Sequence, residues 1–182
     1  MKDIELLTFW KITWRTTVVH TVTYFIAGIL AFSLFNYAER FADPVISSYM
    51  RQTDDPLIMA GVLFQPIRGF LFGIVFWLLR EILFVKRNGW LIAWIMLITV
   101  GIVSTFGPAP GSIEGLIYTK FPVADQLGGL IEILVQSLLL SILVVYWVRH
   151  TDLKWLNWVL IILFFIILLM PAMGLLAANA RV

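Results

Sequence analysis

The sequence predicts an all-α protein, a bundle of about five transmembrane helices preceded by an amphipathic helix at the membrane surface. Of its 182 residues 61% are hydrophobic and only 13% are charged, whereas a soluble domain carries about 25% charged residues. Its apolar runs approach the roughly 20 residues that a helix needs to cross the hydrocarbon core. They are continuous and lack the alternation typical of outer-membrane strands. We therefore expect a single integral membrane domain over residues 1–182.

Residues 1–16 are predicted to form a separate helix that lies on the cytoplasmic membrane surface. On a helix, one face of this segment is apolar and carries Ile4, Leu7, Trp10 and Trp14. Another face is polar and carries Glu5, Thr8, Lys11 and Arg15. This division is typical of an interfacial anchor; the same helix could alternatively dock a partner.

Five apolar segments are predicted to span the membrane: residues 17–37, 57–84, 89–106, 126–148 and 155–177. The first could be mistaken for a secretion signal, because Ala31-Phe32-Ser33 resembles a cleavage site. The acidic residues Asp3 and Glu5 before it oppose that interpretation, and we expect an uncleaved span. Most tryptophans and tyrosines lie near span ends, as in the aromatic belts of membrane proteins.

The charges between the spans predict the orientation. Basic residues dominate before the first span and in every second loop, at Lys2, Lys11, Arg15, Lys86, Arg87, Arg149 and Lys154. Acidic residues outnumber basic ones in the alternate loops, which contain Glu39, Asp43, Asp54, Asp55, Glu114 and Asp125. Because Lys and Arg are retained on the cytoplasmic side, the N-terminus is predicted inside and the C-terminus outside, in a plasma or inner membrane.

The second span is interrupted at Pro66 and carries Gln65 and Arg68 in its outer half. One straight helix over residues 57–84 would measure about 42 Å, too long for a core of about 30 Å without tilt. Proline suits a first helical turn and disrupts an interior. We therefore expect either a short interfacial helix followed by a span that begins at Pro66, or one tilted helix kinked there.

Arg68 is predicted to face the fourth span. It shares a helical face with Gly69 and Gly73, a small-residue pair that allows close approach of another helix. In the fourth span Glu132 lies at a similar depth. The remaining residues on its face are Asp125, Gln136 and the two glycines Gly128 and Gly129, which are expected at a helix contact.

Since a charge inside a membrane usually has a partner, Arg68 and Glu132 are expected to pair. The pair could be a structural bridge between two helices. It could instead belong to an outward-facing polar cavity lined by Gln65, Arg68, Glu132 and Gln136.

The segment over residues 107–118 is rich in glycine and proline, yet too apolar for a freely solvated loop. It could be a plain interfacial turn. Alternatively it folds back over the cavity as a lid, since irregular backbone is tolerated at membrane depth where it lines a protein cavity. Glu114 and Tyr118, one helical turn apart, would then contribute to ligand binding.

The sequence offers little enzymatic chemistry. The chain has no cysteine, and we find no zinc-binding, serine-hydrolase or phosphate-loop motif. Its two histidines are His20, in the inner part of the first span, and His150, in a cytoplasmic turn. Haem ligation would need both rings to face each other across the bundle, so no metal site and no cofactor is expected. The net charge of +2 is too small to indicate nucleic acid.

These observations predict a small multi-pass membrane protein that binds or passes a ligand through an outward-facing polar pocket, as a transporter or a substrate-binding subunit does. The alternative is a structural or accessory subunit in which Arg68 and Glu132 only fix helix packing. An intramembrane enzyme that uses Glu132 or Glu114 is a third hypothesis. Besides the bilayer, a second copy of the chain or a larger membrane complex remains a candidate partner.

Overall fold

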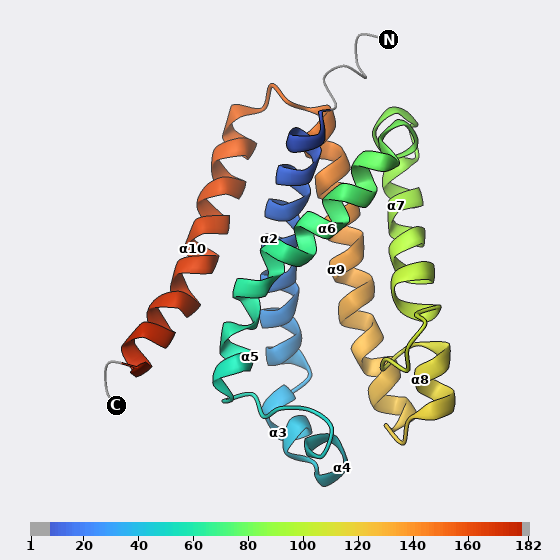
Figure 1. The fold of residues 1–182 in the computed structure, drawn as a ribbon, viewed down its shortest axis with the longest axis vertical. Coiled ribbons are helices and arrows are strands. Elements are labelled where there is room, and N and C mark those ends of the chain that lie inside the picture. The colour runs from blue at the N-terminus through green and yellow to red at the C-terminus, as the bar shows by residue number, and fades with distance from the viewer. Residues whose placement is uncertain (1–7, 180–182) are drawn as a thin grey trace.

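The computed structural model describes residues 8–179 and, within them, contains helices and no strands (Figure 1). The long helices are α2 (Phe9–Leu34), α6 (Gln65–Leu78), α7 (Gly89–Ile98), α9 (Val123–Arg149) and α10 (Lys154–Asn179). The short ones are α3 (Tyr37–Ala42), α4 (Pro44–Ser47), α5 (Pro56–Ala60) and α8 (Ile113–Tyr118). A 3₁₀ turn, η1 (Gly61–Phe64), and two π-helical turns, η2 (Glu81–Val85) and η3 (Thr99–Val103), complete the order.

Four helical segments of the described chain are long and apolar enough to cross a membrane: Phe9–Leu34, Pro56–Leu78, Val123–Arg149 and Lys154–Ala177. The predicted third span is a shorter apolar helix, Gly89–Val103, whose last turn is π-helical. This helix still runs alongside α9 and therefore adds a fifth passage along the bundle. As a result, α2 begins at one end of the bundle and α10 finishes at the other (Figure 1). The predicted count of five is thus supported for four segments.

The predicted break near residue 16 is absent from the structure. A single helix runs from Phe9 to Leu34, while residues 1–7, which carry the rest of the predicted surface helix, lie outside the described part of the chain. Thr13, Arg15 and Thr16 are buried. The Arg15 guanidinium donates to the carbonyl of Trp147 near the end of α9 and lies 4.9 Å from the Trp147 ring centroid. Helix contacts therefore cover Arg15 of the predicted polar face, whereas Thr8 is exposed and Lys11 is half-buried.

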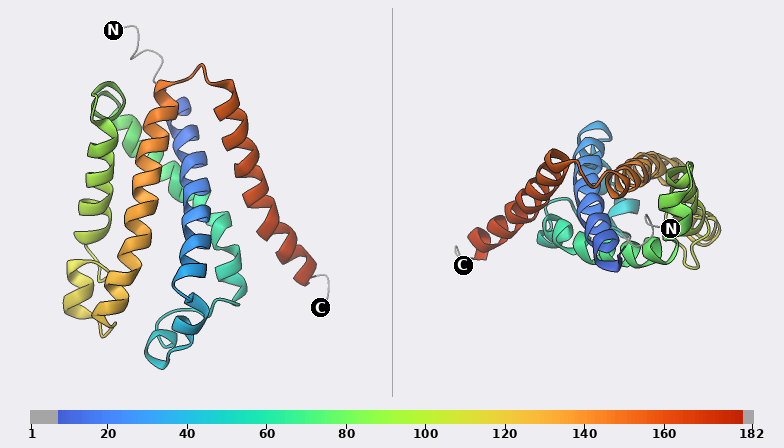
Figure 2. Two further views of the ribbon diagram at one scale, coloured as in Figure 1. Left: turned by 180° about the vertical axis from the view of Figure 1, so that it is seen from behind. Right: turned by 90° about the horizontal axis from the view of Figure 1, so that it is seen from above.

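Helix α2 lies at the centre of the fold, in contact with α6, α9 and α10 (Figures 1 and 2). Helix α6 crosses it obliquely at two glycines. A Cβ atom on Gly69 would lie 2.8 Å from the Cα of Thr17, and one on Gly73 would lie 2.7 Å from the Cα of Thr13. The small-residue pair therefore brings two helices of the same chain into backbone contact.

The second span bends where the sequence predicted a discontinuity. Helix α6 begins at Gln65 with Pro66 in its first turn, directly after the 3₁₀ turn that joins it to α5. It ends at Leu78, earlier than the predicted boundary at residue 84, and η2 follows. Pro66 thus lies in the first turn of α6, where its missing N–H is tolerated, and α5, η1 and α6 follow one another without a break from Pro56 to Leu78.

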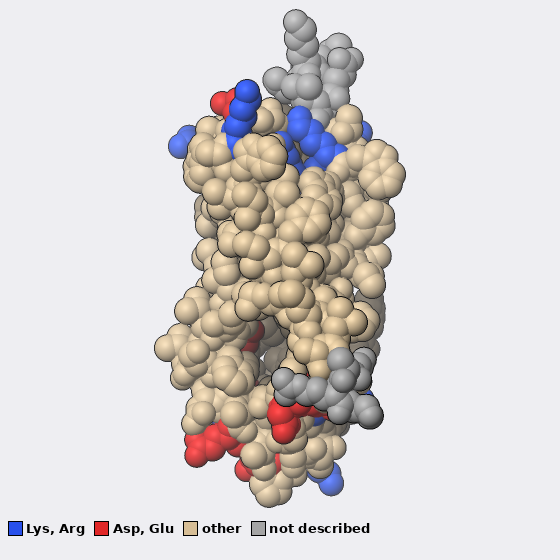
Figure 3. All heavy atoms as spheres, turned by 90° about the vertical axis from the view of Figure 1, so that its left-hand side faces the viewer, with Lys and Arg blue, Asp and Glu red and all other residues tan. Residues whose placement is uncertain are grey.

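The two ends of the bundle differ in charge. Lys and Arg predominate at the end where α2 begins, and Asp and Glu predominate at the other end (Figure 3). At the acidic end α3 and α4 follow α2, and α8 precedes α9 (Figure 1). Helices α3 and α4, together with the loop before α8, form a roof over the space between α2, α6 and α9, and this space contains the candidate site.

Candidate functional site

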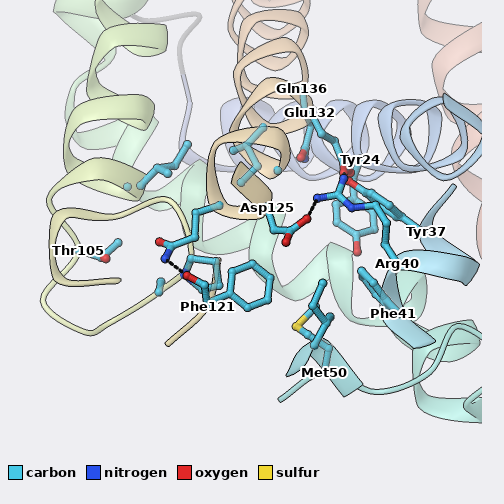
Figure 4. A pocket seen from close by; sticks show the side chains of 18 of the residues that line it. Tyr24, Tyr37, Arg40, Phe41, Met50, Thr105, Phe121, Asp125, Glu132 and Gln136 are labelled. Atoms are coloured by element: carbon cyan, nitrogen blue, oxygen red, sulfur yellow. Dashed lines mark hydrogen bonds and ion pairs between the residues drawn. The ribbon is translucent and has the colours of Figure 1, made fainter. Parts of the chain in front are cut away.

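A cavity of about 400 Å³ lies beneath the roof at the acidic end of the bundle (Figure 4). Ligand pockets typically measure about 300–1,000 Å³. Its polar lining comes from four helices and one loop: Tyr24 of α2, Tyr37 and Arg40 of α3, Arg68 of α6, Asp125, Gln126, Glu132 and Gln136 of α9, and Thr105. Its apolar lining includes Phe41, Ile46, Met50, Ile102, Phe121 and Ile133.

Arg40 and Asp125 form an ion pair across the mouth of the cavity (Figure 4). The pair joins α3 in the roof to the first turn of α9. Their side chains are 28% and 24% exposed, respectively, so both charges are largely withdrawn from solvent. The Arg40 guanidinium also lies 3.4 Å from the position of a Cβ on Gly128, which leaves little room for a larger residue there.

Tyr37 connects the roof to the interior by donating its hydroxyl to one carboxyl oxygen of Glu132. Burial, together with the hydrogen bond to Glu132 and the charge of that residue, raises the pKa of the Tyr37 hydroxyl above its ordinary value. The hydroxyl therefore keeps its proton at neutral pH and remains a donor. Tyr37 can take this position because Asn36 adopts a left-handed conformation, with φ 50°, which turns the chain at the end of α2.

The predicted ion pair between Arg68 and Glu132 is not formed. Both side chains line the cavity, but over residues 8–179 the ion pairs are Arg40–Asp125 and Arg51–Asp55. Tyr37 takes the place of Arg68 as the partner of Glu132. The Arg68 guanidinium lies 5.6 Å from the ring centroid of Phe72, one turn further along α6, and the side chain is exposed to the cavity.

A second cavity of about 170 Å³ lies deeper in the bundle and shares Arg68, Gly101, Ile102, Ile133 and Gln136 with the first. The rest of its lining is Phe72, Leu97 and Leu140 with the polar residues His20 and Ser137. The shared residues make the two cavities neighbours, with Arg68 at their junction.

Gln65 is buried beside the deeper cavity instead of lining the outer one. Its amide oxygen lies 3.2 Å from Nε2 of His20, and its amide nitrogen donates to the carbonyl of Gly61 over 3.2 Å. Because the amide nitrogen is used by Gly61, the oxygen accepts from His20, and Nε2 carries the proton. Nδ1 of His20 is then an acceptor, and it is buried without a hydrogen-bond partner among residues 8–179.

The structure brings together only part of the predicted ligand-binding set. Arg68, Glu132 and Gln136 line the cavity, whereas Gln65, Glu114 and Tyr118 do not. Glu114 and Tyr118 lie on α8, whose Tyr118 side chain is 72% exposed. The loop covers the cavity through Ala109 and Pro110, which precede α8. Gly129, expected at a helix contact, lines the cavity and has open space in place of a neighbouring atom.

Six polar lining residues were absent from the predicted site: Tyr24, Tyr37, Arg40, Thr105, Asp125 and Gln126. The sequence could have indicated Asp125, because it lies two helical turns before Glu132 on the same face of α9. It could also have indicated Arg40, which is a basic residue in a predominantly acidic loop. No sequence pattern points to Tyr37, because it follows a turn that ends the periodic pattern of α2.

Gln126 fixes the loop that covers the cavity. It is 2% exposed, accepts from the N–H of Gly111 over 3.2 Å and donates to the carbonyl of Phe121 over 2.8 Å. Gly111 has a φ of +84°, which favours glycine. The side-chain amide of Gln126 thus supplies hydrogen-bond partners to the N–H of Gly111 and the carbonyl of Phe121. Buried backbone groups of this kind need such partners.

We expect Gln126→Ala to release this loop, because the mutation leaves the N–H of Gly111 and the carbonyl of Phe121 unpaired. An unsatisfied buried group costs about 1–3 kcal/mol. Hydrogen exchange over residues 107–121 should accelerate while exchange in α2 stays unchanged. Gln136→Ala, on the same helix and in the same cavity, is the matched control and should leave the loop protected. Equal exchange in both variants would contradict this role.

The comparisons with known proteins add no relative. No family model, curated protein sequence or solved structure matches the chain. Residues 8–179 contain no cluster of His, Cys, Asp or Glu that could hold a metal ion. The site is therefore interpreted from its own chemistry.

Proposed function

We propose that this is a multi-pass membrane protein that binds, or passes, a small polar ligand through an outward-facing cavity, as a transporter or a substrate-binding subunit does. The observation that supports the proposal most is the convergence of charged and tyrosine side chains on a cavity of about 400 Å³ beneath a folded roof. Charges at membrane depth are costly and are retained where they have a function. Arg68 in particular lies in the cavity with no carboxylate in ion-pair contact among the described residues.

We further propose that the basic end of the bundle faces the cytoplasm of a cell with a plasma or inner membrane. Lys86 and Arg87 lie in the turn between η2 and α7, Arg149 ends α9, and Lys154 begins α10. The cavity lies at the opposite, acidic end (Figure 3). With positive residues inside, its mouth faces outward.

The alternative, a structural or accessory subunit, is favoured by the pairs Arg40–Asp125 and Tyr37–Glu132, which tie the roof to α9. These pairs account for three of the four charged groups in the cavity without any ligand. They leave Arg68 unexplained, so Arg68 distinguishes the two functions. For the third hypothesis, an enzyme, only Glu132 remains in the cavity, because Glu114 does not line it.

Purification in mild detergent followed by mass spectrometry of bound small molecules tests the proposed function. The wild-type protein should retain a small molecule or lipid that Arg68→Gln loses, because glutamine is polar and hydrogen-bonding but lacks the charge and the planar fork of the guanidinium. Arg51→Gln is the matched control, since Arg51 is exposed and paired with Asp55 in the loop after α4. It should retain the same molecule.

A structural subunit would give a different result in the same experiment. It would co-purify with other membrane proteins, and Arg68→Gln would change neither the set of proteins nor any bound small molecule. Retention of identical molecules by wild-type protein and Arg68→Gln contradicts the binding function.

A further inference from the structure

We infer that the ligand is a small zwitterion with an apolar group: its acidic group binds Arg68, its amino group binds Glu132, and its apolar group enters the deeper cavity. The inference rests on the proposed function and specifies its ligand class. It is argued from the two charges that share the cavity without pairing, and from the lining of the deeper cavity.

Arg68 provides the site for the acidic group. Its guanidinium is permanently charged and has five N–H donors in a planar fork that matches a carboxylate or a phosphate. Within residues 8–179 no carboxylate lies within ion-pair distance of it. The side chain is exposed to the junction of both cavities. An anionic group at this junction would satisfy donors that the described protein leaves open.

Glu132 provides the site for the amino group. Tyr37 occupies only one of its carboxyl oxygens, and a carboxylate can accept several hydrogen bonds. The residue is partly exposed and lines the same cavity as Arg68, from the facing helix α9. Asp125, the other carboxylate of the cavity, is already paired with Arg40. Glu132 is therefore the acidic group with capacity for a ligand ammonium.

The separation of these two charges is informative. Opposite charges in a low-dielectric cavity attract strongly, and each has a side chain long enough to move. Yet Tyr37 holds Glu132 on the side of the roof, and Phe72 lies against the Arg68 guanidinium. The cavity thus presents a cation and an acid that are held apart, and a zwitterion can bridge such a pair with both of its charged groups.

The deeper cavity determines the third part of the ligand. Beyond Arg68 its lining is apolar at Phe72, Leu97, Ile102, Ile133 and Leu140 and polar at His20, Gln136 and Ser137, with no acidic residue among the described ones. A cavity of about 170 Å³ with this lining suits an apolar substituent better than a second charged group. An apolar amino acid and the headgroup region of phosphatidylethanolamine share this chemistry, and they are distinguished below by experiment.

Binding of four probes to the full chain in phosphatidylglycerol nanodiscs tests the inference. They are L-leucine, N-acetyl-L-leucine, L-leucinamide and dihexanoyl-phosphatidylethanolamine. At least one zwitterion, L-leucine or the short phosphatidylethanolamine, should bind. N-acetyl-L-leucine and L-leucinamide, which lack the amino and the acidic charge respectively, should bind at least about tenfold more weakly than L-leucine if L-leucine is the zwitterion bound. Arg68→Gln and Glu132→Gln should each lower the affinity for the zwitterion that binds by at least about tenfold.

The results distinguish a free amino acid from a lipid as the ligand, and they distinguish failure of this inference from failure of the proposed function. Binding of L-leucine alone indicates a free amino acid, and binding of the short phosphatidylethanolamine alone indicates a lipid. Two results would refute the zwitterion as ligand class while leaving an anion-binding function intact. One is that N-acetyl-L-leucine binds as tightly as the zwitterions; the other is that Glu132→Gln binds the zwitterion as tightly as the wild-type protein does. If no probe binds, this inference is overturned, and the co-purified molecules still decide the proposed function. Arg51→Gln and the unfolding temperature of each variant control for misfolding.

Discussion

Replacing Gly73 with leucine is expected to destabilise the protein by about 3 kcal/mol, the upper part of the range for overpacked sites. A Cβ at this position would lie 2.7 Å from the Cα and 3.1 Å from the carbonyl oxygen of Thr13. These are backbone atoms of α2, which cannot rotate away as a side chain could. The helices must separate, and separation exposes the Gly69 contact as well. The free energy of unfolding in detergent, measured by denaturant titration, should fall accordingly.

Gly28→Leu is the matched control for this prediction. Gly28 also lies in a helix long and apolar enough to span a membrane, but a Cβ there meets no atom of the described residues within 4 Å. Its stability should change little or rise slightly, since leucine is a better helix former than glycine. Equal losses in the two variants would show that helix composition, and not the α2–α6 contact, determines the stability.

A double-mutant cycle on Arg40 and Asp125 should give a coupling energy of about 1–3 kcal/mol. Their side chains are only 28% and 24% exposed, and removing one partner leaves the other charge partly buried and unpaired. Arg40→Ala and Asp125→Ala should therefore each destabilise the protein, whereas the double variant should lose less than the sum. Unfolding by denaturant in detergent measures all four proteins.

The same cycle on Arg68 and Glu132 provides the comparison. These side chains share a cavity but form no ion pair within the part of the chain that the structure describes. Their losses should add to within about 0.5 kcal/mol when no ligand is present. A larger coupling energy for Arg68–Glu132 than for Arg40–Asp125 would contradict this expectation and would indicate that the ion pair predicted from the sequence does form.

The membrane class could be predicted because apolar length is a local property of the sequence. The boundaries of the spans were harder to predict from the sequence, and the start of α2 is an example. Thr16, Thr17, Thr21 and Thr23 are polar, but each hydroxyl donates to a carbonyl of its own helix, so these side chains pack as apolar ones do. The predicted boundary at residue 17 followed from Lys11 and Arg15, which were assigned to a surface helix, whereas the helix of the structure is continuous from Phe9 to Leu34. The second candidate span ends at Leu78, before the predicted residue 84, and the π-helical turn Glu81–Val85 follows it.

The candidate site was predicted in part for a related reason. Arg68, Glu132 and Gln136 lie on regular helices, where spacing identifies a shared face. Tyr37 and Arg40 follow the left-handed turn at Asn36, and their positions depend on contacts with a helix 85 or more residues later in the chain. No periodic pattern carries that information. The expected Arg68–Glu132 pair was wrong because Tyr37 reaches Glu132 from the roof.

Labelling of introduced cysteines tests most directly whether the cavity opens outward to water. The natural chain has no cysteine, so each single variant reports one position. Gln136 lines both cavities, whereas its neighbour Val135 is 47% exposed and does not line either of them. A membrane-impermeant maleimide added outside intact cells should label Gln136→Cys and leave Val135→Cys, at nearly the same depth, unlabelled. An unreactive Gln136→Cys, or one that reacts only from the cytoplasmic side, would contradict the outward-facing cavity.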